Sequence, residues 1–452
     1  MKPLNLGHLL LLLLLVACRK DKVDDVNPLI PPGDGHDHGA PVENTASVEG
    51  YSDKVAYYPG DSVRLMISTA TDSLVSIALY RYGLTDELIF NAEDIPAKRQ
   101  DYFKYSYSWG CVWDTTYSFY LDENLRSGYY CAVVKNSAAN TEYITFIVKE
   151  PREPVTKSKV LVVASTNTWQ AYNLWGGGSF YRYHHNDLGE DIRHSVIVSF
   201  RRPNKADTPR GDKGHLVNAE MHLIRWLEQK GIDYAVASDR DIHGASYQFE
   251  DRKVVMLHAH PEYYTVEMLT NLEQFNLDGG HIMYLGANGL YWKVTLSDDD
   301  QIECRKDGDT HKYGEGTGGL WSEKGRSPAL LVGSHYSGDG YGTYHPYEVL
   351  NETHWVFEGT GLENGDVFGE NCLNGEGASG HETDKRTVDT PEDFITLAKG
   401  TNPDNGGAEL LIRESSGRGI VYSVGSITYT GSLIVDPLVD SITTTVLERC
   451  LQ

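Results

Sequence analysis

Val160-Leu161-Val162-Val163-Ala164 is an unbroken apolar run, and the polar residues Ser165-Thr166-Asn167 follow it directly. A run of this kind is typical of a strand that is buried on both faces, as in a parallel sheet. Residues 216–229 then place apolar side chains at helical spacing, and a helix there would end at Gly231. Further strands and one further helix are predicted at 232–237, 254–257, 266–277 and 281–285. This alternation predicts an α/β fold with a mostly parallel, doubly wound sheet.

The same sheet is expected to continue near the end of the chain. Residues 409–412 and 419–424 are apolar enough to form its late strands, and 441–451 fits a closing helix. Between these parts, residues 297–407 are rich in glycine and have no clear periodicity. Insertions of this length on an α/β scaffold often build binding sites.

The segment before the predicted sheet has a different texture. Residues 63–67, 75–80, 129–134 and 143–148 alternate between apolar and polar side chains. Turn residues such as Pro59-Gly60-Asp61 separate these short strands, which favours a small β-sandwich. The sequence therefore predicts four parts. They are a leader at 1–17, a flexible tether at 18–45, a β-sandwich domain at 46–150 and an α/β domain at 157–452.

The N-terminus resembles the leader of a bacterial lipoprotein. A short positive start precedes the leucine run Leu9–Leu15, and Leu15-Val16-Ala17-Cys18 closes it. Seven leucines are too few for a membrane span, which needs roughly 20 apolar residues, but they suit a signal peptide. The resemblance implies cleavage before Cys18, lipid on that cysteine, and a place in the cell envelope with the membrane as a partner.

Charge and cysteine content narrow the partners. The formal net charge of −24 argues against a nucleic acid partner, whose phosphates need a basic surface. An exported protein is free to form disulfides, and Cys111–Cys131 and Cys304–Cys372 are the pairings considered, with Cys450 left over. A small-molecule, glycan or peptide substrate fits the excess of tyrosine over phenylalanine, and a homo-oligomer is compatible with the sequence.

Polar and aromatic residues gather where the predicted strands end. The first strand leads into a segment whose candidate pocket residues are Asn167, Trp169, Tyr172 and Asn173. A later strand leads into His260 and Glu262, and the next one into Asn288. Open α/β sheets bind ligands beyond the carboxyl ends of their strands, so these segments are expected to meet in one pocket.

Several kinds of chemistry are disfavoured. No Gly-x-Ser-x-Gly or Gly-x-Cys-x-Gly turn follows a strand, which argues against a nucleophile elbow. The glycines Gly176-Gly177-Gly178 lack the lysine of a P-loop. His258-x-His260-x-Glu262 offers metal ligands, although a polar strand end explains the same residues equally well.

At these segments the sequence resembles the large (beta) subunit family of N,N-dimethylformamidase. The resemblance covers the chain from about residue 158 to its end, and the preceding β-rich part is similar as well. The matching stretches are 164–173, 260–264, 288–292, 354–357, 359–362, 380–385 and 425–428. One departure is Tyr264, where relatives more often have Trp.

The resemblance implies a sheet related to class I glutamine amidotransferases, without their cysteine nucleophile. It also implies a single Fe³⁺ held by two tyrosines and one glutamate, for which Tyr263, Tyr291 and Glu382 are the candidates by motif. His260, Glu262, Asn288 and His381 are then expected as catalytic or supporting residues around the metal. Phenolates and a carboxylate are hard anionic donors that suit ferric iron.

Two functions follow from the sequence. The first is an envelope-anchored, iron-dependent hydrolase of an amide C–N bond. The second is a surface lipoprotein without catalysis that binds glycans or peptides. Bound iron together with amide turnover distinguishes the first from the second.

Overall fold

The computed structural model of the chain describes residues 35–153, 156–181, 193–211, 213–244 and 248–452. The predicted leader and Cys18 lie outside these residues. Within them, no helix has the length and apolar character needed to cross a membrane.

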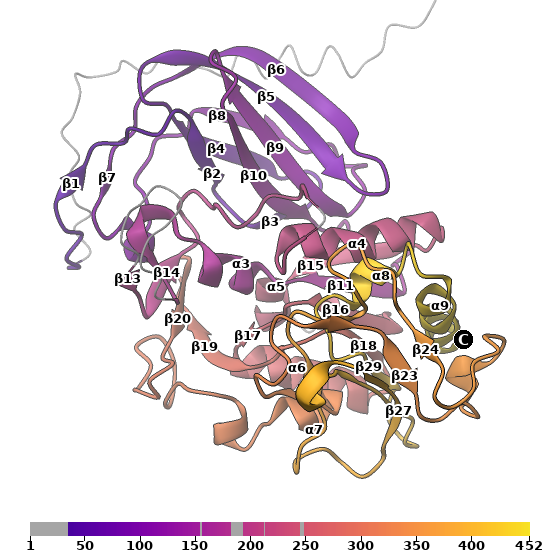
Figure 1. Cartoon of the computed structure of the whole chain (residues 1–452). Coiled ribbons are helices and arrows are strands. Elements are labelled where there is room, and N and C mark those ends of the chain that lie inside the picture. The colour runs from indigo at the N-terminus through magenta and orange to yellow at the C-terminus, as the bar shows by residue number, and fades with distance from the viewer. Residues whose placement is uncertain (1–34, 154–155, 182–192, 212, 245–247) are drawn as a thin grey trace, which may run out of the picture.

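Two antiparallel-rich sheets form the N-terminal part of the molecule, drawn in indigo and violet in Figure 1. The five-stranded sheet has the order β3 (Ala56–Tyr57), β10 (Thr141–Val148), β9 (Gly128–Asn136), β5 (Ser73–Tyr82) and β6 (Glu87–Ala97). The three-stranded sheet has the order β2 (Glu49–Ser52), β4 (Ser62–Ser68) and β8 (Tyr117–Tyr120). Side chains from both sheets share one core, including Ile67, Leu79 and Phe146. The sheets therefore pack face to face, in partial agreement with the predicted sandwich.

The other face of the five-stranded sheet is covered by the rest of the chain. The hydroxyl of Tyr129 donates to Glu220 at 2.6 Å, and Arg81 forms an ion pair with Glu228 at 2.7 Å. Both glutamates belong to helix α4 (Val217–Gln229). Tyr129, Cys131 and Val133 belong to the same apolar cluster as Leu223 and Trp226. The two parts thus share a continuous core.

A nine-stranded sheet forms the centre of the C-terminal part. Its order is β15 (Tyr234–Ser238), β11 (Val160–Ala164), β16 (Val254–Ala259), β18 (His281–Gly286), β29 (Val421–Ser423), β28 (Glu409–Arg413), β27 (Phe394–Gly400), β23 (Tyr347–Val349) and β24 (Val367–Phe368). The first five strands run parallel to one another. From β29 to β24 every neighbouring pair is antiparallel.

The predicted mostly parallel, doubly wound α/β fold is therefore wrong. Half of the strand pairs in the large sheet are antiparallel, and the described residues contain more strand than helix. The difference arises in the glycine-rich stretch before residue 407, which supplies β23, β24 and β27 to the sheet. The predicted late strand at 409–412 does join this sheet, but it runs antiparallel to both neighbours.

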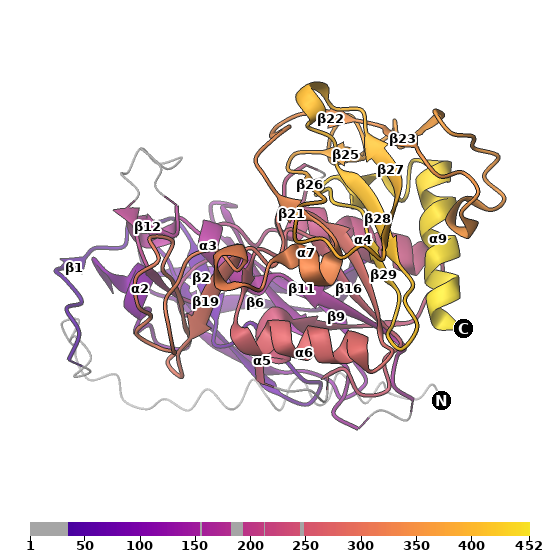
Figure 2. The same cartoon turned by 90° about the horizontal axis from the view of Figure 1, so that it is seen from below.

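Helices cover both faces of the large sheet (Figure 2). On one face α4, α8 (Tyr429–Ser432) and α9 (Pro437–Leu451) bury side chains such as Leu223 and Val446 against Val162. On the other face α5 (Asp239–Gly244), α6 (Val266–Leu277) and α7 (Pro328–Val332) pack against Val163 through residues including Leu272. The continuous apolar run in β11 is explained by this burial on both faces.

A four-stranded sheet lies beside the carboxyl ends of the parallel strands. Its order is β14 (Ile197–Ser199), β20 (Gln301–Cys304), β19 (Trp292–Leu296) and β17 (Tyr263–Tyr264). The remaining short elements of the chain include α2 (Ser106–Trp109), α3 (Thr166–Tyr172), η2 (Trp175–Gly177), β12 (Gly178–Ser179), β13 (Arg193–His194), η4 (Ser322–Lys324), β21 (His335–Tyr336), β22 (Tyr344–His345), η5 (Trp355–Phe357), β25 (Ser379–Gly380), β26 (Asp384–Lys385) and η6 (Pro403–Asn405).

Two further predictions concern the cysteines and the tether. Cys111, Cys131, Cys304, Cys372 and Cys450 are all free thiols, so neither of the disulfide pairings considered from the sequence is present. Within the predicted tether, β1 (Pro41–Val42) pairs with β7 (Tyr102–Phe103), and the ring of His36 stacks on Trp109 at 3.9 Å. The end of this segment therefore lies against the β-rich part.

Candidate functional site

Residues that follow the central parallel strands converge at one end of the large sheet. Tyr172 ends α3, which follows β11, and His260 and Glu262 follow β16. Asn288 follows β18, and Glu382 lies between β25 and β26. The ligand-binding end of an open sheet with parallel strands is this carboxyl end, so these residues meet at the end of the sheet where a ligand is expected.

Glu262 is surrounded by tyrosines. The hydroxyl of Tyr181 donates to both carboxyl oxygens of Glu262, at 2.7 and 3.0 Å. The hydroxyl of Tyr263 donates to that of Tyr181 at 2.8 Å, and the rings of Tyr172 and Tyr181 lie 4.3 Å apart. Burial raises the pKa of Glu262, while Lys306 and hydrogen bonds from Tyr181 and Tyr172 oppose the rise. Two phenols therefore converge on one buried carboxyl group.

His260 lies between two carboxyl groups. Its Nε2 is 3.3 Å from an oxygen of Glu262 and 3.3 Å from an oxygen of Glu382. The ring is almost completely buried, and among the described residues neither of its nitrogens has a hydrogen bond of good geometry. The amide of Asn288 donates to Glu382 at 2.9 Å and holds that carboxyl group in place.

Burial sets the protonation of this group. It raises the pKa of Glu382 to about 8, and the nearby Glu262 adds to the rise. Burial also holds the pKa of His260 well below its usual range, helped by His215 and His381. Near neutral pH, Glu382 therefore tends to keep its proton while His260 stays neutral.

Lys306 is a cation that lies beside the phenols. Its Nζ lies 3.5 Å from the centre of the Tyr181 ring and 4.9 Å from that of Trp292. Burial lowers its pKa, although the charges of Glu262 and Glu382 act in the opposite direction. The loop that carries Lys306 is anchored by Glu303, whose carboxylate accepts the backbone N–H groups of Lys312 and Tyr313.

Histidines form another wall of the site. The ring of His215 lies 5.4 Å from that of His260 and stacks on His381 at 5.3 Å. The rings of His215 and Tyr172 pack edge to face, with their centres 4.6 Å apart. Burial lowers the pKa of His215 to about 3, so this wall is uncharged at neutral pH.

Left-handed backbone at residues other than glycine is frequent at this end of the sheet. Ala259, Asn288, Leu290 and His381 have φ values of 54°, 46°, 51° and 64°. Ala259, Leu290 and His381 directly precede His260, Tyr291 and Glu382 in the sequence. Asn288 itself donates to Glu382. Such conformations cost about 1–2 kcal/mol each for a side chain with a Cβ, and they persist where function requires them.

The candidate ligands Tyr263, Tyr291 and Glu382 do not form one hydrogen-bonded group. Tyr263 is buried and donates to Tyr181, whereas the ring of Tyr291 lies 5.3 Å from His335. Glu382 contacts His260 and Asn288. Among the described residues, no hydrogen bond joins either of these two tyrosine hydroxyls to Glu382.

Of the four candidate pocket residues in the first segment, Tyr172 is the one that reaches Glu262. Trp169 donates to the buried Glu220 at 2.8 Å, on the side of the β-rich part. Asn167 donates to the carbonyl of Tyr263, and Asn173 donates to that of Pro203. These three residues support the scaffold.

The sequence did not identify Tyr181, His215 or Lys306. They lie outside the predicted strand exits, and none belongs to a recognisable motif. These three residues are identified by their position near Glu262 and His260 in the folded chain, and the sequence carries no sign of that position.

A family model described as "N,N-dimethylformamidase beta subunit-like, C-terminal" matches residues 76–441. The chain belongs to this family. The match begins inside β5, so the family unit includes much of the β-rich part as well as the large sheet.

Two curated relatives are named N,N-dimethylformamidase beta subunit. The protein from Alcaligenes sp. is 28% identical over 364 residues, which cover 70% of this chain and 46% of the relative. The protein from Paracoccus aminophilus is 27% identical over 398 residues, which cover 72% of this chain and 52% of the relative. The chain thus spans about half the length of these relatives. A solved superoxide reductase from Ignicoccus hospitalis is similar at a TM-score of only 0.15, with 12% identity, 25% of this chain and 80% of that chain covered.

The donors at the site fit the iron site that the family resemblance implies. Within the described ranges, no group of three or more His, Cys, Asp and Glu side chains is arranged to hold a metal ion. A site made of two tyrosines and one glutamate contains only one residue of those four types, the glutamate. Tyr172, Tyr181 and Glu262 supply this donor set around one carboxyl group. The geometry favours them over Tyr263, Tyr291 and Glu382.

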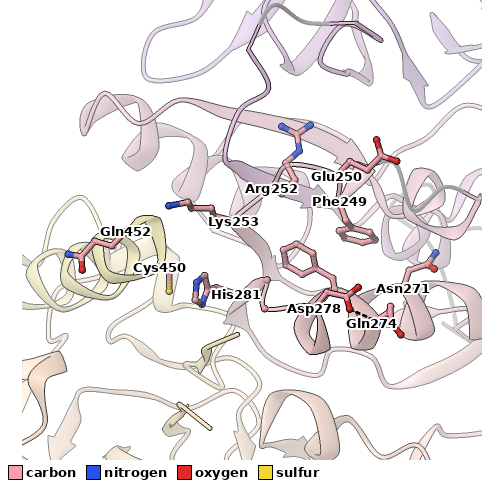
Figure 3. A pocket seen from close by; sticks show the side chains of 13 residues that line it. Phe249, Glu250, Arg252, Lys253, Asn271, Gln274, Asp278, His281, Cys450 and Gln452 are labelled. Carbon is pink, nitrogen blue, oxygen red and sulfur yellow. Dashed lines mark hydrogen bonds between the residues drawn. The ribbon is translucent and has the colours of Figure 1, made fainter. Parts of the chain in front are cut away.

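The opposite end of the large sheet also holds a cavity, of about 560 Å³ (Figure 3). Its lining includes Phe249, Arg252, Lys253, Asp278 and His281, with Cys450 and Gln452 from the C-terminal end. Two of the charged groups here have partners. Arg252 pairs with Glu150 at 2.8 Å, and Gln274 donates to Asp278 at 2.8 Å. This cavity contains no group comparable to the His260 cluster.

Proposed function

We propose that this protein hydrolyses the C–N bond of an amide at the cluster formed by His260, Glu262 and Glu382. The observation that carries the proposal is the position of the buried His260 Nε2, 3.3 Å from an oxygen of each glutamate. Membership in the dimethylformamidase family supports an amide as the substrate class. The natural substrate need not be dimethylformamide, since a fold does not fix its substrate.

The side chains can supply both proton transfers that amide hydrolysis needs. A base must take a proton from the attacking water, and an acid must give one to the leaving nitrogen. His260 is neutral, so its ring can accept the first proton, and the burial that keeps it neutral also makes it a weak base. Glu382, with a pKa raised to about 8, can donate the second, and Asn288 orients it. Water adds to the carbonyl carbon, the C–N bond breaks, and a carboxylic acid and an amine are released.

We further propose that Tyr172, Tyr181 and Glu262 hold one ferric ion. Two phenolates and a carboxylate are hard donors, and three protein ligands leave positions open for substrate. When bound, the ion supplies a Lewis acid that polarises the amide carbonyl. Lys306, over the Tyr181 ring, favours the ionised phenol.

Turnover by the purified protein tests the hydrolase proposal. The protein is assayed with a panel of formamides, acetamides and N-alkyl amides, and both the released amine and the released acid are quantified. The assay is run after loading with iron and again after chelation. Equimolar amine and acid in the loaded sample support the proposal. Release of neither product from any amide, despite bound iron, contradicts it.

We also propose that the protein is anchored in the cell envelope by lipid on Cys18. The leader sequence supports this location, which confines the substrate to amides that reach the envelope. Labelling with a radioactive fatty acid tests the anchor. The wild-type protein is expected in the membrane fraction with label, and Cys18→Ser is expected to lose both. Label that is retained by Cys18→Ser contradicts the proposal.

A further inference from the structure

The two phenols of the proposed metal site belong to one loop. Tyr172 is the last residue of α3, and Tyr181 lies two residues beyond β12. The backbone N–H of Phe180 donates to the carbonyl of Ala171 at 3.2 Å, so the neighbours of the two tyrosines are joined. We call residues 170–181 the phenol loop. The ring centres of Tyr172 and Tyr181 lie 4.3 Å apart, where this hydrogen bond closes the loop.

The guanidinium of Arg202 is surrounded by carbonyls of the phenol loop. Arg202 follows β14, which lies beside α3 (Figure 1), and its side chain is 1% exposed. Four of its N–H groups donate to the carbonyls of Trp175 at 2.8 Å, Gly178 at 3.0 Å, and Gln170 and Asn173 at 3.2 Å. The remaining N–H donates to the carbonyl of Ser199 at 3.1 Å. A guanidinium has five N–H donors, so every one of them is used.

Backbone oxygens take the place of a carboxylate around Arg202. Among the described residues, none of its hydrogen bonds or ion pairs goes to a side chain. Burying a charge is costly unless hydrogen bonds compensate for the lost water. The carbonyls of Gln170 and Asn173 suit this role because they lie at the C-terminal end of α3, which carries partial negative charge. An apolar side chain in place of Arg202 would leave the carbonyls without donors.

Three consecutive glycines give the phenol loop its shape. Gly176 and Gly177 are left-handed, with φ values of 75° and 77°, which glycine adopts without steric cost. A Cβ added to Gly178 would lie 2.3 Å from the ring of Tyr107, so a larger residue does not fit there. The triplet therefore lets the chain turn the carbonyls of Trp175 and Gly178 toward one cation. A P-loop instead turns N–H groups toward a phosphate.

We propose that Arg202 is a positioning residue that sets the separation of the Tyr172 and Tyr181 phenols for binding of one ferric ion. Arg202 acts through the phenol loop and is not a catalytic residue. This inference rests on the proposed metal ligands Tyr172, Tyr181 and Glu262. Lysine cannot replace the arginine, because an ammonium has three donors and lacks the planar fork that reaches carbonyls on several sides.

Arg413 provides a matched control. It is also 1% exposed and donates to the carbonyls of Leu330 and Leu331, but it lies at the amino end of the parallel strands. Arg202→Lys and Arg413→Lys are both expected to unfold at a lower temperature than the wild type. Arg202→Lys is also expected to bind iron at least about tenfold more weakly, the usual effect of residues that orient metal ligands, while Arg413→Lys stays within about twofold. Competition with a chelator measures the iron affinity.

The phenolate-to-iron absorption band, measured per bound iron, separates positioning from a general loss of stability. The band is expected to shift or weaken in Arg202→Lys and to stay unchanged in Arg413→Lys. Added guanidinium ion, at a concentration too low to denature the protein, is expected to restore the band in Arg202→Ala, whereas ammonium ion is not. If Arg202→Ala does not fold, the comparison of the two lysine variants decides.

Two results would overturn the positioning role and leave the metal ligands standing. One is a wild-type iron affinity and band in Arg202→Lys. The other is an equal loss of affinity in Arg202→Lys and Arg413→Lys, because the effect would then follow stability alone. A wild-type protein that binds no iron, or a band that is unchanged in Tyr172→Phe and Tyr181→Phe, would contradict the proposed ligands and this inference together.

Discussion

The two ends of the parallel strands differ in how their buried charged groups are paired. At the amino end, Arg252 is paired with Glu150 and donates to the carbonyl of Ser158, and Lys253 donates to the carbonyl of Leu451. At the carboxyl end, Glu262 and Glu382 are buried beside one neutral imidazole. Burying ionisable groups without an ion pair of opposite fixed charge in direct contact is costly, so the carboxyl end lowers the stability of the fold.

The backbone differs in the same way. At the amino end, left-handed conformations are adopted by Gly279, at φ 95°, and by Asp251, a residue type that tolerates them. At the carboxyl end, Ala259 and Leu290 adopt them despite their side chains. Because residues that strain the fold persist where activity depends on them, the carboxyl end is the functional one. The well-formed cavity at the amino end is explained by structure alone.

The largest expected effect is the loss of activity in Glu262→Gln. The change removes the carboxylate on which the phenols converge, so amine release is expected to fall by about 1,000-fold or more. Because burial disfavours the charged glutamate and the glutamine oxygen still accepts the hydrogen bond from Tyr181, the midpoint of thermal unfolding is expected to stay the same or rise. Amine release and calorimetry measure the two outcomes. Retained activity would contradict the assignment of the carboxyl end of the parallel strands as the functional end.

Arg252→Leu tests the amino end. It leaves Glu150 without its cation and the carbonyl of Ser158 without a donor, so the free energy of unfolding is expected to fall by about 3 kcal/mol. Turnover per folded molecule is expected to be unchanged. Denaturant unfolding gives the first value, and an assay at a temperature where the variant is folded gives the second. A loss of turnover would mean that the amino end also serves the reaction.

The free energy of unfolding is expected to decrease as the pH rises because of Glu220. This residue lies beside Ser165 at the carboxyl end of β11. Burial raises its pKa in the folded chain to about 7. Between the unfolded and folded pKa values the folded state binds more protons, so stability is fully present below the unfolded pKa and decreases as pH rises through 7. The decrease from this group is expected to be on the order of 2 kcal/mol.

Denaturant unfolding from pH 5 to 8 measures this effect. In Glu220→Gln, the loss of unfolding free energy over this pH range is expected to be smaller than in the wild type by the amount that Glu220 contributes. Glu228→Gln is the matched control on the same helix, because Arg81 helps to hold the pKa of Glu228 below its usual value. A pH profile in Glu220→Gln identical to the wild type would contradict the prediction.

The smallest expected effect concerns the strained backbone. Ala259→Gly removes a Cβ from a left-handed residue and is expected to stabilise the fold by about 1 kcal/mol. Ala164→Gly, at the end of the neighbouring strand β11, is expected to destabilise it by about 1 kcal/mol because φ there is not left-handed. Denaturant unfolding of both variants compares them. A similar destabilisation in both would show that the strain at Ala259 is negligible.

The sequence predicted those elements whose signal is local. The apolar run in β11 and the helical spacing in α4 and α6 gave the parallel half of the large sheet. The antiparallel half was missed because β23 and β24 are only three and two residues long. Such short strands have no periodicity of their own, and their pairing is set by tertiary contacts.

The candidate site was predicted in part for the same reason. His260, Glu262 and Asn288 follow recognisable strands, so their convergence could be expected from topology. Tyr181 and His215 lie outside recognisable strands, and Lys306 lies in the loop after β20. The family resemblance supplied two tyrosines and a glutamate as a donor type, but only the fold indicates which tyrosines accompany which glutamate.

The most direct test of this account is the visible absorption of the iron-loaded protein. Phenolate bound to ferric iron gives a charge-transfer band, and Tyr181→Phe and Tyr172→Phe are each expected to weaken or shift it. Tyr263→Phe and Tyr291→Phe, with bound iron measured in every sample, are the matched controls and are expected to keep it. A band that survives in Tyr181→Phe and Tyr172→Phe but disappears in Tyr263→Phe or Tyr291→Phe would contradict the assignment.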